Sequence, residues 1–122
     1  MTERPAPAAQ AGSAGHIVDV TTIPWRQKRE GVAIKTITGE RCQMGFTRLD
    51  PGFSSDHAHD EEQMGLVLAG EVELGIGDEK RLCGPGVAYH IPAGMPHSFR
   101  VVSDTYAEIL DIFSPPKEEN RQ

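Results

Sequence analysis

The sequence predicts an all-β fold, a sandwich or barrel of about nine or ten short strands. Its 122 residues are enough for one domain with one core. Segments that alternate apolar and polar residues, or that are rich in β-branched residues, are separated by turn-forming residues at intervals of about 6–12 positions. No segment carries apolar residues at helical spacing, and the 13 glycines and 9 prolines suit closely spaced turns.

The expected strands follow one another along the chain. Residues 31–38 alternate and are β-branched, and a two-residue turn at 39–40 predicts a hairpin with residues 41–49. Residues 50–52, Asp-Pro-Gly, predict another turn, and residues 71–76 alternate acidic and apolar side chains as a half-exposed strand does. The remaining expected strands are residues 17–20, 64–69, 80–83, 87–91, 97–102 and 105–113.

This pattern divides the chain into a flexible N-terminal tail (1–15), a single domain (16–117) and a C-terminal tail (118–122). The first segment is rich in Ala, Pro and Gly and has no hydrophobic period, and the last is polar. We expect both ends to be loosely held, with the alternative that the first part of the polar segment from Pro115 folds back onto the domain.

Composition excludes several classes of function. A net charge of −6 argues against binding to nucleic acid and to an anionic membrane surface, which both need a basic face. Cys42 and Cys83 are too few for a disulfide framework, and we expect two reduced, largely buried thiols. No apolar run is long enough to span a membrane and no signal peptide is visible, so we expect a cytoplasmic protein.

Three histidines and a glutamine predict a metal centre. His57 and His59 are one residue apart, so they share a face if they lie in a strand, and Gln63 and His97 then come from neighbouring strands. For the pair alone, two surface histidines on a polar loop are the favoured interpretation. Three imidazoles and an amide oxygen would form a neutral ligand set that leaves room for a substrate, as in a Lewis-acid site. One divalent ion is expected, with Zn, Ni, Fe or Mn left open.

Asp111 is the candidate catalytic residue. It lies in a segment whose two faces are otherwise apolar, and a buried carboxylate is rare unless it is paired or functional. If functional, it is a general base or acid for proton transfer. The alternative is a structural Asp held by backbone amides or by an arginine such as Arg100.

The two histidine-bearing segments resemble the two sequence blocks of the cupin superfamily. The first block runs from Gly52 through His57-x-His59 and Gln63 to Gly70, and the second runs from Gly86 to Pro92-x-Gly-x-x-His97. Both match except that Gln63 stands where Glu is usual. The resemblance covers residues 25–117 and implies a jelly-roll β-barrel for the domain, but it leaves the chemistry open, because this fold has many functions.

Within the small cupins the chain looks like the KdgF type, which linearises unsaturated uronates from pectin and alginate. The resemblance rests on residues 62–70, 73–77, 89–97 and 110–115. It implies metal ligation by His57, His59, Gln63 and His97, and a pocket lined by Asp111, Phe113 and Lys117.

Lys117 departs from the KdgF type, which has Arg at this position. Arg binds a carboxylate with two parallel hydrogen bonds, whereas Lys offers a point charge. From the residues alone, Phe113 is equally a core side chain and Lys117 is a solvated tail lysine.

The resulting hypothesis is a metal-dependent isomerase or lyase of carbohydrate metabolism. It would move a proton or open a ring in a small, anionic, uronate-like substrate, with Asp111 moving the proton. The alternatives are an isomerase or cyclase of antibiotic or polyketide biosynthesis, a metal-dependent dioxygenase and a non-catalytic ligand-binding cupin. By resemblance we also expect a homodimer.

Overall fold

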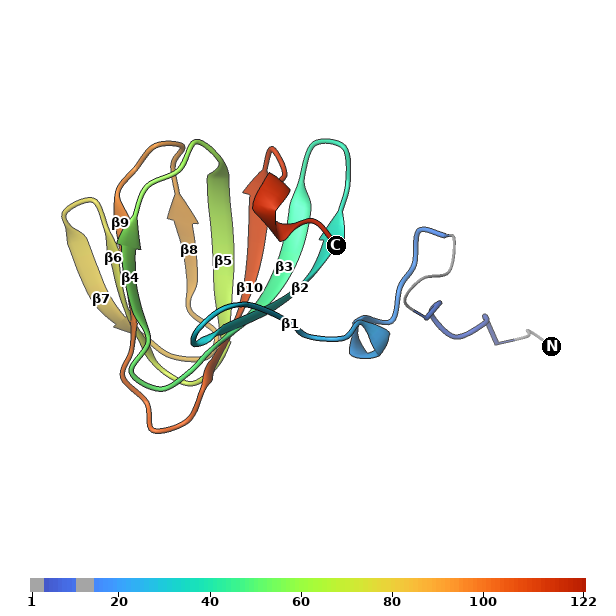
Figure 1. The fold of residues 1–122 in the computed structure, drawn as a ribbon, viewed down its shortest axis with the longest axis horizontal. Coiled ribbons are helices and arrows are strands. Elements are labelled where there is room, and N and C mark those ends of the chain that lie inside the picture. The colour runs from blue at the N-terminus through green and yellow to red at the C-terminus, as the bar shows by residue number, and fades with distance from the viewer. Residues whose placement is uncertain (1–3, 11–14) are drawn as a thin grey trace.

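The computed structural model describes residues 4–10 and 15–122, which form ten strands in two antiparallel sheets. The larger sheet has the order β1-β2-β3-β10-β5-β8 and the smaller has the order β4-β9-β6-β7, and they form the two walls of the molecule in Figure 1. The predicted all-β sandwich is therefore confirmed. The strands are β1 (Arg26–Arg29), β2 (Val32–Thr38), β3 (Gln43–Leu49), β4 (Ser54–His57), β5 (Glu62–Ala69), β6 (Val72–Ile76), β7 (Glu79–Cys83), β8 (Ala88–Ile91), β9 (His97–Val101) and β10 (Ala107–Ser114).

The core lies between the sheets, where alternate side chains from both walls meet. Strand β10 pairs with β3 on one side and β5 on the other, which places it at the centre of the larger sheet. Its residues alternate strictly between buried and half-buried, so every second side chain points inward. Ile109 from β10, Val67 from β5 and Val72 from β6 are each 1% exposed.

The prediction of a strand at residues 17–20 is wrong. Val18 makes an isolated bridge with Ala9, and the chain then turns into a 3-10 helix, η1 (Val20–Thr22). The Asp19 carboxylate accepts a hydrogen bond from the Thr21 backbone N–H at 3.0 Å. A short polar side chain that binds its own backbone in this way favours a turn over a strand ladder.

Two strands were not predicted, β1 and β4, and both are polar. Their sequences, Arg-Gln-Lys-Arg and Ser-Ser-Asp-His, contain no apolar residue that could mark a buried face. They lie at the edges of their sheets, where tertiary pairing with β2 and β9 supplies the order.

The C-terminal segment that the sequence assigns to a tail packs against the larger sheet. A second 3-10 helix, η2 (Glu118–Asn120), lies beside β10, β3 and β2 in Figure 1. The Thr36 hydroxyl donates to the Asn120 carbonyl at 2.8 Å, and the Gln43 amide donates to the Lys117 carbonyl at 3.2 Å. Parts of the predicted N-terminal tail, residues 1–3 and 11–14, lie outside the described residues.

The outer face of the larger sheet is apolar near its centre. Ile112 of β10 stands in register between Met44 of β3 and Met64 of β5. Met44 is 37% exposed and Met64 is 55% exposed. The homodimer stays a prediction, and this face provides apolar surface that a second copy could cover.

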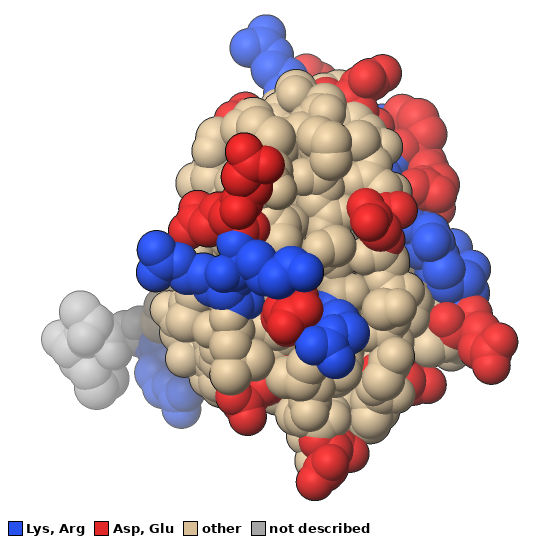
Figure 2. Space-filling view, turned by 90° about the vertical axis from the view of Figure 1, so that its left-hand side faces the viewer, with Lys and Arg blue, Asp and Glu red and all other residues tan. Residues whose placement is uncertain are grey.

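The outer face of the smaller sheet carries both signs of charge. Oε2 of Glu73 lies 3.1 Å from Nη2 of Arg100, and its Oε1 lies 3.8 Å from Nζ of Lys80. Figure 2, which views the molecule from the side of this sheet, shows basic and acidic groups next to one another. This face therefore presents no continuous basic surface.

The two cysteines differ in exposure. Cys83 is buried as expected, whereas Cys42 is exposed, which corrects the prediction that both thiols are buried. Cys42 lies in the connection between β2 and β3, where the chain leaves the core. Within the described part of the chain, no helix is long and apolar enough to cross a membrane.

Gly65 provides a test of the packing between strands. It is the cross-strand partner of Tyr89, and a Cβ at Gly65 would overlap the Tyr89 ring. We expect Gly65→Ala to lower the free energy of unfolding by about 1–3 kcal/mol, measured by denaturant titration, because overpacking forces the ring to move. Gly84→Ala is the matched control, because nothing lies within 4 Å of the added Cβ. Equal stability of the two variants would contradict this account.

Candidate metal centre and pocket

The three predicted histidines lie together at one end of the smaller sheet. His57 is the last residue of β4 and pairs in register with His97, the first residue of β9. His59 lies two residues beyond β4, so the two histidines do not share one strand. The loop after β4 nevertheless brings the His59 ring back toward the other two histidines. One ligand atom from each of the three side chains lies within 4.8 Å of the others.

Two of the rings are oriented by backbone carbonyls. The Nδ1 atom of His59 lies 3.0 Å from the Glu61 carbonyl, and the Nδ1 atom of His97 lies 2.9 Å from the Met95 carbonyl. An Nδ1–H that donates to each carbonyl leaves Nε2 with a free lone pair. A hydrogen bond from one ring nitrogen that leaves the other nitrogen free is typical of metal-binding histidines. The Nε2 atom of His97 is buried and has no partner among the described residues.

Gln63 reaches the histidines from the opposite sheet. Its side-chain Nε2 donates to Oδ1 of Asp111 at 2.9 Å, and its Oε1 faces Nε2 of His59 at 3.0 Å. With Nδ1 of His59 protonated, both atoms of this second contact are hydrogen-bond acceptors. Two facing acceptors are stabilised by a cation between them, so the residues present fit a divalent metal ion.

The protonation states suit this role. Burial is the main cause that lowers the pKa of His57 to about 4, with the neighbouring His97 adding to it. Burial also lowers the pKa of His97. Both imidazoles are therefore neutral near pH 7, which is the form that binds a metal.

Asp111 lies on the inner face of β10 and is 6% exposed. Its Oδ1 accepts hydrogen bonds from the Tyr89 hydroxyl at 2.6 Å and from Gln63. Burial raises the pKa of Asp111 to about 6, and the two hydrogen bonds oppose that rise. The alternative of a structural pair with Arg100 is wrong, because Arg100 pairs with Glu73 on the outer face.

Tyr89 reaches Asp111 across an intervening strand. Asp111 of β10, Gly65 of β5 and Tyr89 of β8 form one row of register partners. Because Gly65 has no side chain, the Tyr89 ring lies over it and places its hydroxyl on Asp111. In the sequence, the signal for Tyr89 is the alternation in residues 87–91, which places it inward with Ile91.

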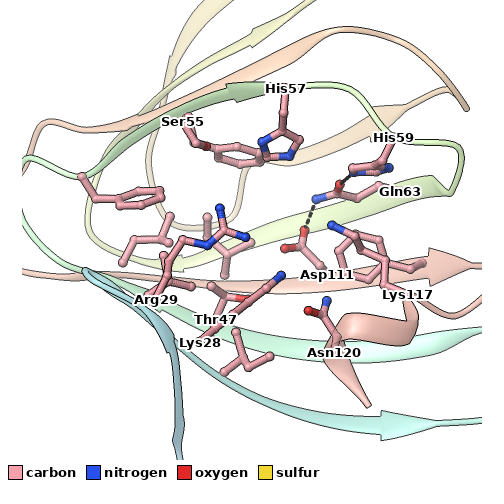
Figure 3. Close-up of a pocket in the computed structure, with 17 residues that line it drawn as sticks. Lys28, Arg29, Thr47, Ser55, His57, His59, Gln63, Asp111, Lys117 and Asn120 are labelled. Atoms are coloured by element: carbon pink, nitrogen blue, oxygen red, sulfur yellow. Dashed lines mark hydrogen bonds between the residues drawn. The ribbon is translucent and has the colours of Figure 1, made fainter.

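Phe113 and Lys117 complete the pocket as the resemblance implies. The Phe113 ring is 5.9 Å from the His59 ring, and Nζ of Lys117 is 5.4 Å from the centre of the Phe113 ring. The Lys117 side chain is 13% exposed, so the alternative of a solvated tail lysine is wrong. Figure 3 shows Lys117 and Asp111 directed toward the same space.

The structure brings all seven predicted residues to one place. Six of them line an inner cavity of about 90 Å³ between the sheets, and His97 is buried against the rings of His57 and His59. An outer cavity of about 470 Å³ shares His57, His59 and Lys117 as walls. The inner cavity also includes residues that we did not predict, namely Lys28, Arg29, Thr47, Ser55 and Asn120. Lys28 and Arg29 lie on the polar strand β1, Ser55 lies on the polar strand β4, Asn120 lies on the C-terminal segment and Thr47 lies on β3. None of them belongs to a motif.

Fold and site together define a small β-barrel with a cluster of three histidines between its sheets. We call His57, His59 and His97 the metal-ready cluster, because their side chains together could hold a metal ion. Comparison with protein families agrees, because the family described as "Cupin domain" matches residues 45–113, more than half of the chain. The chain belongs to the cupin family.

Known proteins resemble the chain over most of its length. An uncharacterised protein of Streptomyces coelicolor is 26% identical over 93 residues, which covers 75% of this chain and 88% of that protein. KdgF from a Halomonas species is 24% identical with a TM-score of 0.78, and the match covers 87% of this chain and 98% of KdgF. The polyketide cyclase RemF from Streptomyces resistomycificus is 22% identical with a TM-score of 0.72, covering 88% of this chain and 90% of RemF. The two structures share the fold.

The histidine cluster predicts metal binding that depends on His97. We expect His97→Ala to weaken binding of Zn²⁺ or Ni²⁺ by at least about 100-fold, beyond what loss of a supporting contact costs. Isothermal titration with each ion measures this. His90→Ala is the matched control, because His90 is exposed and pairs only with Glu62 among the described residues. Equal affinity in both variants would exclude the cluster as the site.

Proposed function

We propose that the protein is a metal-dependent cupin enzyme that moves a proton in a small oxygenated substrate and thereby opens a ring or shifts a double bond. We further propose an anionic substrate, with unsaturated uronates as the first class to test, in carbohydrate metabolism. The observation that carries this proposal is the direct link between Asp111 and the metal-ready cluster. Gln63 contacts the Asp111 carboxylate with one end of its amide and His59 with the other.

A divalent metal held by His57, His59, Gln63 and His97 would supply Lewis-acid polarisation of a substrate oxygen. The chain's own residues provide the rest. Both hydrogen bonds to Asp111, from Tyr89 and Gln63, end on Oδ1. This leaves Oδ2 as the atom that exchanges a proton with a bound substrate.

The side chains around Asp111 position the substrate and keep water away. Phe113 forms an apolar wall beside His59, and Nζ of Lys117 lies over the Phe113 ring. Figure 3 shows Asp111 beside the end of the Lys117 side chain, so a substrate that reaches from the histidine cluster to Lys117 would lie next to Asp111. Positioning of this kind is a large part of catalysis by fixed acids and bases.

A second candidate is an isomerase or cyclase that acts on a biosynthetic intermediate with the same metal. Lys117 favours it, because a single ammonium group binds a carboxylate less specifically than the Arg of the KdgF type would. The likeness to the fold of the polyketide cyclase RemF is compatible with this reading. Oxygen uptake by the metal-loaded protein separates both candidates from a dioxygenase.

Turnover tests the role of Asp111. We expect metal-loaded protein to remove the ultraviolet absorbance of unsaturated uronates, and Asp111→Asn to slow this by about 10²–10⁴-fold, the usual contribution of a general acid or base. Metal content, measured by mass spectrometry, stays unchanged in this variant because Asn keeps an oxygen for Gln63 to contact.

Removal of the metal is the second arm of the same experiment. Protein stripped by a chelator should lose turnover and regain it when the ion is restored. Full activity in the stripped protein, or in Asp111→Asn, would contradict the proposed chemistry.

A further inference from the structure

The inner cavity is cationic although the chain is acidic. Lys28, Arg29 and Lys117 line it, and Asp111 is the one carboxylate among the described residues of its lining. The whole chain carries a net charge of −6. Figure 3 shows the three basic side chains ending around the same space near Asp111. Such a local concentration of positive charge attracts anionic ligands even when the net charge of the protein is negative.

Two of these cations share one carboxylate oxygen. Oε1 of Glu119 lies 2.9 Å from Nζ of Lys117 and 3.5 Å from Nζ of Lys28. The two lysines come from distant parts of the sequence, β1 and the segment after β10, and each side chain is 13% exposed. The Glu119 side chain lies at the rim and is 53% exposed.

The Glu119 carboxylate offsets the repulsion between the two lysines. Two poorly solvated ammonium groups next to each other repel, and burial followed by the Lys117 charge lowers the pKa of Lys28. Glu119 compensates for this, and its hydrogen bond with Lys117 is the main cause that lowers the pKa of Glu119 to about 2. A carboxylate is therefore what this pair of lysines binds, and the chain supplies one of its own.

We propose that Glu119 is an internal stand-in for the carboxylate of the substrate, bound between Lys28 and Lys117 until an anionic ligand displaces it. The ligand class is a small hydroxy or oxo acid. Its carboxylate lies between the two lysines, and its other oxygens reach toward the histidine cluster. The position of the ligand's carboxylate follows from the two lysines and does not depend on the proposed function. The position of its other oxygens at the histidine cluster rests on the proposed function.

Displacement of Glu119 requires only a rotation of its side chain. The backbone of η2 stays in place because the Asn120 carbonyl accepts from Thr36 and the Lys117 carbonyl accepts from Gln43. Glu118, the neighbouring residue, pairs with Arg121 at 2.7 Å instead and makes no ion pair with either lysine. The two adjacent glutamates thus have the same charge and different roles.

Binding of a simple uronate tests the proposal without turnover. Isothermal titration of D-glucuronate into the metal-loaded protein measures affinity, with D-glucose as the uncharged analogue. We expect Glu119→Gln to bind glucuronate about 2–5-fold more tightly than the unaltered protein, the change expected when a partly exposed competing ion pair is removed. Lys28→Gln should weaken glucuronate binding by a similar factor and leave glucose unaffected.

Glu118→Gln is the matched control, because it removes one negative charge from the same rim without touching the lysines. Glu119→Ala repeats the test with a second side chain, and thermal melts confirm that each variant folds. The proposal is overturned if Glu119→Gln binds glucuronate no more tightly than Glu118→Gln, or if no variant binds glucuronate. Tighter binding in Glu119→Gln together with absent uronate turnover would support the carboxylate site and reject the proposed reaction.

Discussion

The site depends on a chain of buried hydrogen bonds that crosses the larger sheet. Tyr89 of β8 and Gln63 of β5 both donate to Asp111 of β10, and Gln63 then meets His59 from the opposite wall. Buried polar groups must be satisfied, so each member restricts the positions of the others. The register Asp111–Gly65–Tyr89 makes the contacts possible, because only a residue without a side chain lets the tyrosine ring cross β5.

Neither sheet contains the site by itself. The smaller sheet carries His57 and His97, and the loop after β4 carries His59. The larger sheet carries Gln63 and Asp111. The packing of the two sheets therefore sets the distance between the metal-ready cluster and the carboxylate. Gln63 therefore contacts both His59, four positions before it, and Asp111, 48 positions after it, only in the folded barrel.

Charge is distributed differently in the pocket and over the molecule. The net charge is negative, yet Lys28, Arg29 and Lys117 surround the cavity. Polar edge strand β1 and the C-terminal segment bring these cations there, and both are segments whose sequences have no hydrophobic pattern. The apolar strands thus build the barrel, while the polar segments at its edge provide the charges that favour an anionic ligand.

The sequence by itself determined the all-β class, most strands, the histidine cluster and the position of Asp111 as a carboxylate in a buried strand. Apolar alternation and turn residues are local signals, and a carboxylate in an apolar strand stands out without any structure. Only the tertiary structure decided that β1 and β4 form, that residues 118–122 pack on the larger sheet, and that Lys28 and Tyr89 lie at the pocket. Polar segments become ordered only when another strand satisfies their backbone, and a side chain that reaches over a neighbouring strand leaves no mark in the order of residues.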